Sequence, residues 1–408
     1  MLRQAVILCG GLGTRLGGLT AETPKPLLPV DGNPFLDVLL FELGRHGIAR
    51  ILLLAGFAAH KVQEYALTTP MMARFGLELE VSVEPLRAGT GGALWHARDR
   101  LDDAFLLLNG DSWFDINLLE LTRHADDPSA TAVIAVRHLA DASRFGVVEI
   151  DKGRVTRFHE RPAHSGEGFV SGGVYACQRA LVDSLDPVCS LEADVFPCFA
   201  RQGKLLAIPF DGYFIDIGVP DSFARAGREI PRQRQRPAAF LGRDAVLNQD
   251  DGSGGSRARF RWIDGATAAV KLLNDKGLFV FVVTNQAGLA HGLYSEEDIR
   301  ALQAQLTSEL AAAAAHLDDL RYCQFHPDAI LSEYRPAGDW PRPAPGMITD
   351  LLETWPVDRK ASFLIGDRPS DCTAASAAGI ESWLFPGGDL PRFVSNILSS
   401  QGIRGSRF

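Results

Sequence analysis

A glycine-rich turn near the start of the chain has the composition of an anion-binding site. Its polar members follow the apolar run 5–8 and Cys9, and they are Gly10, Gly11, Gly13, Thr14 and Arg15. Glycines leave backbone N–H groups open to close approach by an anion. Arg15 adds positive charge, as does Lys25, which stands between two prolines. We interpret this stretch as a cradle for a polyphosphate. The alternative is a plain strand-to-turn connection with ordinary surface cations.

Two aspartates in apolar surroundings are candidates for holding a divalent cation. Asp111 follows the apolar run 105–108, and Asp216 stands between two isoleucines. A carboxylate in such surroundings is poorly solvated unless a positive group pairs with it, and Mg²⁺ prefers oxygen ligands. The alternative for Asp111 is a cap on a following helix or turn. Only the fold can unite the two aspartates, because they lie far apart in the sequence.

The spacing of apolar residues predicts the elements that must position these groups. We expect strands at 5–8, 51–56, 77–83 and 105–108, and helices at 35–46, 60–65 and 93–101. Such alternation predicts a mostly parallel sheet with helices on both faces, whose ligands lie beyond the carboxyl ends of the strands. Beyond residue 130 the pattern is richer in strands, and we expect a hairpin around 151–153.

A second glycine-rich stretch immediately precedes the helix expected at 93–101. Its members are Gly89, Thr90, Gly91 and Gly92. A backbone without bulky side chains can lie flat against a nucleobase or bond to its edge. The alternative is a simple tight turn.

The first half of the chain resembles the sugar-1-phosphate nucleotidyltransferases. The resemblance rests on the glycine turn, on Arg15 at a fixed offset and on Pro-Lys-Pro at 24–26. Neither a P-loop nor the Rossmann Gly-x-Gly-x-x-Gly spacing is present. The resemblance implies a Rossmann-like α/β domain with a mixed, mostly parallel sheet, in which residues 89–92 line a base pocket. It also implies that Asp111 and Asp216 hold one Mg²⁺.

The reaction that this family carries out needs positioning and charge neutralisation more than covalent help. A sugar-1-phosphate oxygen attacks the α-phosphorus of a nucleoside triphosphate, and pyrophosphate leaves. By resemblance, Arg15 and the amides of the glycine turn stabilise the leaving pyrophosphate, and Lys25 neutralises the reacting phosphates. Arg15, Lys25 and Asp111 are therefore the expected catalytic residues. Cys9 is expected to be a small core residue.

The resemblance also implies the residues that contact the sugar phosphate. They are Glu160, Arg161, Gly173 and Glu192. Arg161 stands where the family has a lysine, so phosphate binding is retained with a different geometry. Several stretches look most like the branch that acts on D-glycero-α-D-manno-heptose 1-phosphate, usually with GTP. Other hexose-1-phosphate branches share most of the same motifs.

The second half resembles the haloacid-dehalogenase-type phosphatases, above all the branch that removes the 7-phosphate from heptose 1,7-bisphosphate. A polar, basic run flanked by prolines indicates a linker, so we expect domains at 1–228 and 239–408 joined by 229–238. Helices are expected at 266–275 and 296–316, and strands at 279–284 and 362–367. The resemblance implies a second α/β domain. Residues at the family's phosphate- and metal-binding positions are Asp244, Thr284, Asn285, Arg342, Asp367 and Asp371.

This second half departs from its family at decisive positions. Gly242 stands where the family has its nucleophilic aspartate, and glycine has no side chain to phosphorylate. Arg342 replaces a lysine. Of the family's zinc cage only Cys323 is kept, so no zinc is expected and His326 is interpreted as a loop residue. The other expected ligand positions hold Phe325, Gly338 and Trp340. We predict a domain without phosphatase turnover that binds phosphate or Mg²⁺ weakly.

Composition restricts the classes of partner. The 408 residues are 46% hydrophobic and 22% charged, which is typical of a globular protein, and the net charge of −9 argues against general nucleic-acid binding. A local basic cleft can still attract small anions. Six scattered cysteines fit a reducing compartment. Short apolar runs and the lack of a signal peptide indicate a cytoplasmic protein without a membrane partner. The resemblance allows a homo-oligomer but identifies no surface for one.

Three hypotheses follow from the sequence. The first is a nucleotidyltransferase with a silent phosphatase-like domain. The second keeps both activities, in successive steps toward a nucleotide-activated heptose. The third is a regulatory protein that binds a phosphosugar and turns over little. Assays of pyrophosphate and phosphate release distinguish them.

Overall fold

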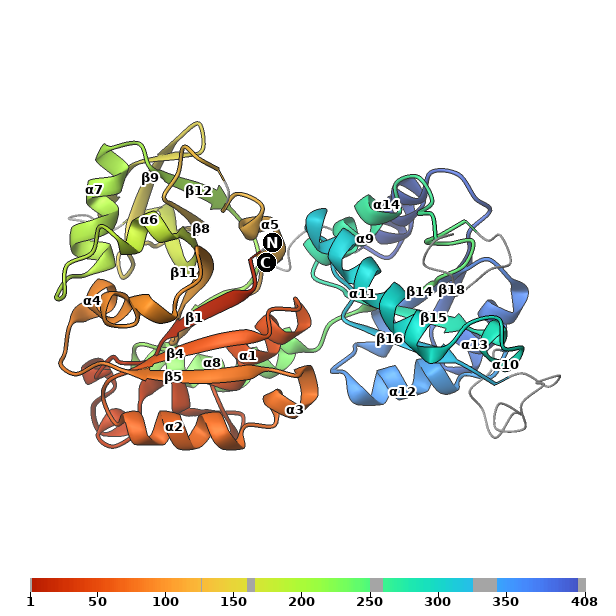
Figure 1. Cartoon of the computed structure of the whole chain (residues 1–408), viewed down its shortest axis with the longest axis horizontal. Helices are drawn as coiled ribbons and strands as arrows, with labels where there is room; N and C mark the ends of the chain where they lie inside the picture. Colours follow the sequence, from red (N-terminus) through yellow and green to blue (C-terminus); the bar gives the residue numbers. More distant parts are fainter. Residues whose placement is uncertain (1, 126, 160–165, 250–259, 326–342, 403–408) are drawn as a thin grey trace. The chain divides into compact units, whose positions relative to one another are not determined.

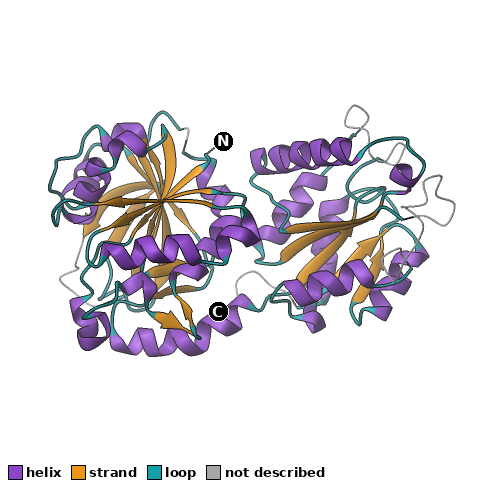
Figure 2. Ribbon diagram, turned by 60° about the horizontal axis from the view of Figure 1, so that its bottom comes forward, coloured by secondary structure: helices purple, strands orange, loops and turns teal. Residues whose placement is uncertain are grey.

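The computed structural model describes residues 2–125, 127–159, 166–249, 260–325 and 343–402. These residues form two compact units, Met1–Arg232 and Gln233–Ser406, and Figure 1 shows the elements of each. In both units a sheet is covered by helices, as Figure 2 shows. Each unit is therefore an α/β domain, as the sequence predicts.

The first unit is built on a nine-stranded mixed sheet with the order β5-β4-β1-β6-β11-β8-β12-β10-β9. The strands are β1 (Gln4–Leu8), β4 (Arg50–Ala55), β5 (Glu78–Val83), β6 (Ala104–Asn109), β8 (Ala132–Leu139), β9 (Val147–Asp151), β10 (Arg154–His159), β11 (Gly168–Gln178) and β12 (Leu205–Pro209). Strands β5, β4, β1 and β6 are parallel neighbours, as are β8 and β12. The remaining neighbours are antiparallel. The parallel arrangement that we expected is thus found in strands β5, β4, β1 and β6, and the rest of the sheet is mixed.

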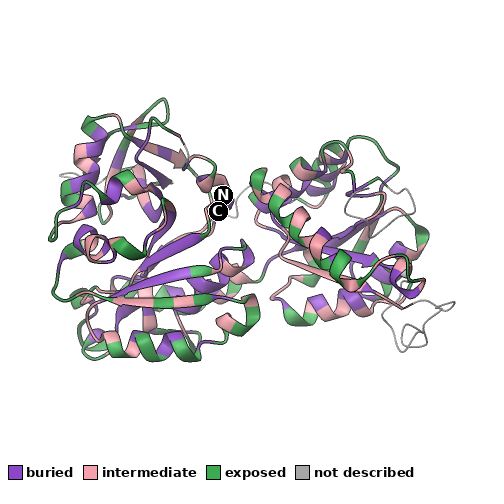
Figure 3. Cartoon of the chain, viewed as in Figure 1, coloured by how far each residue is buried: buried purple, intermediate pink, exposed green. Residues whose placement is uncertain are grey.

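Side chains of β1 alternate between two helical layers. Ala5 and Ile7 pack toward α1 (Leu36–Arg45), α2 (Ala59–Thr68) and α8 (Pro220–Arg234). Val6 packs toward α4 (Gly89–His96), α6 (Arg179–Val182) and α7 (Phe196–Arg201). Because a strand alternates its side chains with a period of two, β1 is buried on both faces, as Figure 3 shows for the centre of this sheet.

Several short elements complete the first unit. They are the 3-10 helices Thr14–Thr20, Lys25–Leu27 and Arg98–Arg100, the π-helix Leu191–Val195, α3 (Met71–Phe75), α5 (Leu118–Thr122), and two small antiparallel sheets made by β2 (Pro29–Val30) with β3 (Asn33–Pro34) and by β7 (Ser112–Phe114) with β13 (Phe214–Asp216). The pair β7–β13 matters for the site, because it connects segments that are distant in the sequence.

Two expectations for the first unit need correction. The second glycine-rich stretch does not precede a helix but forms the first turn of α4. The basic run expected as a linker is largely helical, since α8 continues to Arg234 and tolerates Pro231 inside it. The hairpin predicted around 151–153 is present between β9 and β10, with Lys152 and Gly153 at positive φ.

The second unit is built on a five-stranded parallel sheet with the order β16-β15-β14-β17-β18. Its elements are β14 (Ala238–Gly242), α9 (Ala266–Asp275), β15 (Phe279–Asn285), α10 (Ala287–Ala290), α11 (Glu296–Ala312), β16 (Asp319–Cys323), α12 (Gly346–Thr354), the 3-10 helix Arg359–Ala361, β17 (Phe363–Gly366), α13 (Pro369–Ala377), β18 (Glu381–Leu384) and α14 (Leu390–Ser400). Helix α11 ends earlier than expected, because Ala314 adopts a left-handed conformation with φ 55°. Among the described residues, no helix combines the length and the apolar character needed to cross a bilayer.

Candidate active site

The glycine turn and Asp111 lie at the same edge of the first sheet. Strands β1 and β6 are parallel, and Leu8 pairs with Asn109. The chain therefore leaves both strands at one edge, where Gly110 N donates to Leu8 O at 3.0 Å. The carboxyl ends of β4 and β5 reach the same edge.

One glycine of the turn is required by local geometry, and another lies close to a carboxylate. Gly13 has φ +64°, and a Cβ atom there would lie 2.8 Å from Thr20 Cγ2. The carbonyl of Gly13 accepts bonds from Leu16 N and Thr20 Oγ1, both at 2.9 Å. A Cβ atom at Gly10 would lie 2.7 Å from Glu84 Oε1, whereas one at Gly11 would meet nothing within 4 Å. The turn is thus closed by Thr20 and Glu84 and open at Gly11, next to exposed Thr14 and Arg15.

Glu84 is a candidate site residue that sequence reasoning missed. It follows β5 directly, and its carboxylate lies against Gly10 and Gly56 at the ends of the neighbouring strands. Burial raises the pKa of this carboxyl group, and the Ala88 backbone and the charges of His96 and Arg87 oppose the rise. Its place at a strand end is the signal that could have found it.

Lys25, Asp111, Ser112 and Asp216 form one polar cluster. Lys25 Nζ donates to Asp111 Oδ2 at 2.6 Å, and only 11% of the lysine side chain is exposed. Ser112 Oγ lies 3.3 Å from Asp111 Oδ1 and 3.2 Å from Asp216 Oδ2. Gly218 N donates to Asp216 Oδ1 at 2.8 Å. The pairing of β7 with β13 brings the two aspartates together, because Ser112 is directly opposite Asp216.

The donor set of this cluster fits Mg²⁺. Burial, and then the negative charge of Asp111, raise the pKa of Asp216 to about 6, against the opposing effects of Gly218, Lys25 and Ser112. A carboxylate whose pKa is raised by a neighbouring carboxylate favours a cation between the two. In the described part of the chain, no three His, Cys, Asp or Glu residues gather as a complete metal site. Mg²⁺ suits such a pair, because it commonly takes one or two carboxylates together with water and substrate phosphates.

A cavity of about 130 Å³ lies beside Asp216. Its lining residues are Asn109, Ser112, Arg144, Phe145, Gly146, Phe158, Ser171, Tyr175, Glu192, Phe214 and Asp216. Hydroxyl, amide and carboxylate groups beside aromatic rings suit a polyhydroxylated ligand. The cavity therefore places a polar space next to Asp216 and to Ser112, which contacts both aspartates.

Glu192 is held in that cavity by the second glycine-rich stretch. Thr90 Oγ1 donates to Glu192 Oε2 at 2.7 Å and accepts from Leu191 N at 2.8 Å. The amides of Gly91 and Gly92 donate to Cys189 O at 3.0 and 3.1 Å. A Cβ atom on Gly91 would lie 2.5 Å from Cys189 Sγ. The absence of side chains at these glycines thus lets the segment around Cys189, which leads to Glu192, pack against them. Two of the backbone amides that we expected near a base already donate hydrogen bonds to Cys189.

The other expected sugar-phosphate residues have different outcomes. Glu160 and Arg161 lie outside the described residues. Gly173 has φ +72° and packs against the Asn109 side chain. Asn109 itself, Tyr175 and Arg144 were missed by the sequence reasoning. Asn109 is the last residue of β6, so its place at a strand end could have been predicted from the apolar run before it. Arg144 lies in a loop, where no sequence pattern indicates its position.

No cysteine of the glycine turn is poised as a nucleophile. Cys9 is fully buried, and burial raises the pKa of its thiol to about 12. A thiol in that state is inert at neutral pH. The expectation that Cys9 is a core residue is confirmed by its place in the hydrophobic core.

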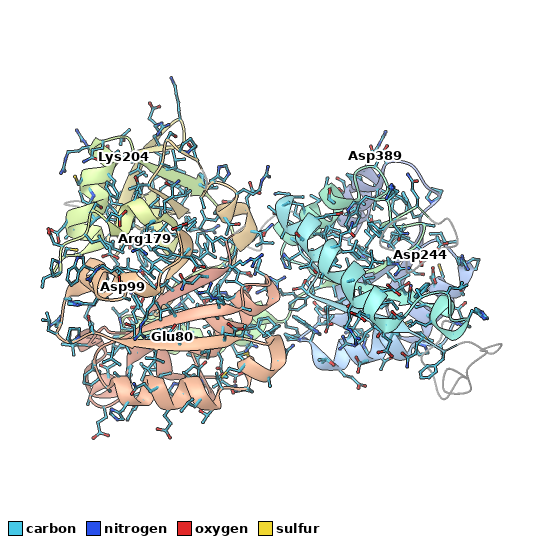
Figure 4. All side chains as sticks on the ribbon, viewed as in Figure 1. Glu80, Asp99, Arg179, Lys204, Asp244 and Asp389 are labelled. Atoms are coloured by element: carbon cyan, nitrogen blue, oxygen red, sulfur yellow. The ribbon has the colours of Figure 1, made fainter. Side chains whose placement is uncertain are left out.

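In the second unit, Asp244 (labelled in Figure 4) is neutralised by the residue next to it. The Arg243 guanidinium donates to Asp244 at 2.9 to 3.1 Å, and only 4% of the arginine side chain is exposed. Thr284 Oγ1 reaches Asp244 Oδ2 at 3.5 Å and accepts from Gln286 Nε2 at 2.9 Å. Sequence reasoning did not foresee that Arg243 occupies this carboxylate.

Two other candidate residues of the second unit, Asp371 and Asp367, are also engaged locally. Asp371 Oδ2 accepts from the amides of Asp367 and Arg368 at 3.1 and 3.2 Å, so this carboxylate caps α13. Asp367 lies 3.3 Å from the Arg368 side chain. Asn285 is exposed at the end of β15. At Gly242 a Cβ atom would lie 3.2 Å from Val246 Cγ2. Arg342, together with positions 326, 338 and 340, lies outside the described residues.

Comparisons with known proteins agree with this division. The model of the nucleotidyl transferase family matches residues 4–233, more than half of the chain, and that of the HAD-hydrolase-like family matches residues 340–391. The D-glycero-alpha-D-manno-heptose 1-phosphate guanylyltransferase of Aneurinibacillus thermoaerophilus is 33% identical over 231 residues, which cover 56% of this chain and 98% of the relative. The crystal structure of HddC from Yersinia pseudotuberculosis complexed with GMP-PN has a TM-score of 0.51 and 27% identity, and the match covers 56% of this chain and all of that one.

The second unit has a relative of its own. The D-glycero-beta-D-manno-heptose-1,7-bisphosphate 7-phosphatase of Rhodopseudomonas palustris is 48% identical over 164 residues, which cover 40% of this chain and 91% of the relative. Each match covers nearly the full length of the relative, so each unit of this chain corresponds to almost all of one of these two proteins. The chain therefore belongs to the nucleotidyl transferase family, and it carries a haloacid-dehalogenase-like domain after its nucleotidyltransferase domain.

Proposed function

We propose that the chain transfers GMP from GTP to D-glycero-α-D-manno-heptose 1-phosphate, yielding a GDP-activated heptose and pyrophosphate. The observation that carries the proposal is the Lys25–Asp111–Asp216 cluster, in which Asp111 lies at the same sheet edge as the glycine turn and Asp216 lines the polar cavity. This arrangement supports binding of a donor nucleotide at the glycine turn and of an acceptor sugar in the cavity. The names of the relatives at both units support a heptose as the sugar.

The transfer follows from this arrangement. An oxygen of the acceptor's 1-phosphate attacks the α-phosphorus of GTP and forms a new P–O bond. The bond between the α-phosphorus and the oxygen that bridges to the β-phosphate breaks, and its electron pair leaves with the pyrophosphate. The glycine-turn amides and Arg15 receive the charge of the leaving pyrophosphate, and Lys25 offsets the charge near the α-phosphate. Asp111 and Asp216 would hold Mg²⁺, which supplies charge neutralisation to the phosphates. Glu192 accepts bonds from sugar hydroxyls.

Glu84 supports a guanine as the base. Its carboxylate lies at the ends of β4 and β5, against the glycine turn. Guanine presents adjacent N–H donors on its base-pairing edge, and a carboxylate accepts two such bonds. Adenine offers an acceptor at the corresponding ring nitrogen, which a carboxylate would repel.

We further propose that the second domain is silent as a phosphatase. Gly242 provides no nucleophile, and Asp244 is bound by Arg243. Loss of a group that forms a covalent intermediate costs many orders of magnitude in rate. A bifunctional enzyme and a phosphosugar-binding regulator remain the alternatives.

Two assays on the full chain test these proposals. Pyrophosphate release should be fastest with GTP and the manno-heptose 1-phosphate, compared with ATP, UTP, mannose 1-phosphate and glucose 1-phosphate. Another preferred pair would replace our substrate assignment, and no release with any pair would favour the regulator. Phosphate release from heptose 1,7-bisphosphate should stay at the background rate, and turnover at enzyme-like rates would show that both activities persist.

A further inference from the structure

The two carboxylates assigned to the metal already have a cation beside them. Lys25 Nζ lies 2.6 Å from Asp111 Oδ2. A Cβ atom at Gly218 would lie 3.5 Å from Lys25 Nζ and 2.7 Å from Asp216 Oδ1, so the ammonium group is packed close to both aspartates. The lysine is 9% exposed, and its contact with Asp111 is therefore poorly screened by solvent.

A metal ion that binds Asp111 comes close to this ammonium group, and the two positive charges repel each other. Every carboxylate oxygen of the pair already has a partner: Lys25 and Ser112 on Asp111, and Ser112 and Gly218 on Asp216. Ser112 and the Gly218 amide are neutral, whereas Lys25, the positively charged group among these partners, repels an incoming cation. Metal binding at Asp111 therefore favours movement of Lys25 toward another anion.

We propose that Lys25 is an internal counter-ion that leaves Asp111 only when a triphosphate is present to receive it. This inference rests on the proposed function for the identity of the metal-binding carboxylates and of the nucleotide. Its consequence is a positive coupling: the metal alone binds weakly, and the metal with the nucleotide binds tightly. By linkage, the metal strengthens nucleotide binding by the same factor.

A simpler role for Lys25 makes a different prediction. If Lys25 only contacts phosphates, its removal weakens nucleotide binding and leaves the binding of metal alone unchanged. If it is a counter-ion, its removal strengthens the binding of metal alone, because two carboxylates then lack their cation.

The test is the binding of Mn²⁺, used as a paramagnetic probe, to the full chain, with and without a non-hydrolysable GTP analogue. No acceptor sugar is added, so the readout is independent of turnover. Lys25→Met should tighten the binding of Mn²⁺ alone by about tenfold, a common size for such coupling, and should lower the Mn²⁺–nucleotide coupling by a similar factor, leaving the part that comes from direct binding of Mn²⁺ by the phosphates. Lys25→Arg keeps the charge and should retain the coupling. Lys25→Gln repeats the test if the methionine variant does not fold.

Two controls define the site of the effect. Ser112→Ala removes a neutral partner of the same carboxylates and should not tighten Mn²⁺ binding. Adding Asp111→Asn to Lys25→Met should remove the gain, which separates this site from any binding in the second domain. The inference is overturned if Lys25→Met, in a folded protein, leaves the affinity for Mn²⁺ alone unchanged or weakens it. The proposed function fails separately, by absence of pyrophosphate release.

Discussion

Ser112 and Asp216 stand directly opposite each other on β7 and β13, and their side chains bond at 3.2 Å across 104 residues of sequence. The same hydroxyl reaches Asp111, its neighbour in the chain, at 3.3 Å. A short antiparallel pair thus connects the two aspartates, and its register fixes which residues meet. Asp216 would lose its place in the cluster if β13 shifted by one residue.

The first prediction concerns the two aspartates. Asp111→Asn and Asp216→Asn should each lower the rate of pyrophosphate release by at least about 100-fold, because each weakens the binding of the metal ion that neutralises the reacting phosphates. Both variants should remain folded by circular dichroism. Asp211→Asn is the matched control: it lies near β13, but its side chain is 76% exposed and should matter little. Near-normal turnover in Asp216→Asn would remove that residue from the mechanism.

The second prediction concerns pH. Burial and Asp111 raise the pKa of Asp216 to about 6, so the folded protein holds this proton more tightly than the unfolded chain does. This group therefore favours folding more at pH 5 than at pH 7, while its proton competes with the metal. The affinity for Mn²⁺, measured with the nucleotide analogue, should fall as the pH drops below about 6 while the protein stays folded. A constant affinity from pH 5 to 7 would contradict the role of Asp216.

The third prediction concerns Gly89. It has φ +78°, and a Cβ atom there would lie 2.5 Å from the Cys189 carbonyl oxygen. Gly89→Ala should lower the free energy of unfolding by about 1–3 kcal/mol, as strained glycine replacements do. It should also raise KM for the sugar phosphate, because the loop it contacts carries Glu192. Gly18→Ala is the control, since Gly18 has open space and no positive φ. Equal thermal stability of the two variants would refute the packing argument.

The fourth prediction concerns Arg243 and Asp244. Removing either partner leaves a poorly solvated charge, so Arg243→Met and Asp244→Asn should each destabilise the second domain by up to about 3 kcal/mol. The limit is modest because 24% of the Asp244 side chain is exposed. The double variant should lose less than the sum of the single losses. Pyrophosphate release should be unaffected in all three. Additive losses would show that the pair is not coupled.

Much of the first domain could be predicted because the relevant signals are local. The runs 5–8 and 105–108 are apolar and short, and both end in polar groups, which predicts buried parallel strands with a site at their ends. The helix at 266–275 in the second domain was predicted with its observed bounds for the same reason. The glycine stretch at 89–92 was misplaced, because glycines favour a turn in isolation, whereas here they admit Cys189 against the first turn of α4.

The remainder depends on tertiary contacts. Nothing local in the sequence predicts that Ser112 faces Asp216, because that follows from the β7–β13 register. The burial of Glu84 against Gly10 depends on the order of β5, β4 and β1 in the sheet. The basic run after Pro231 has the composition of a linker, yet α8 continues into it as far as Arg234.

The central claim is that the first domain transfers a nucleoside monophosphate to a sugar 1-phosphate at Asp111 and Asp216. The most direct measurement incubates the full chain with GTP labelled at the α-phosphate and with D-glycero-α-D-manno-heptose 1-phosphate, and then separates the products. We predict that the label appears in a GDP-sugar and is absent from pyrophosphate, and that Asp111→Asn abolishes this product. Label recovered only in unreacted GTP or in free GMP would contradict the account.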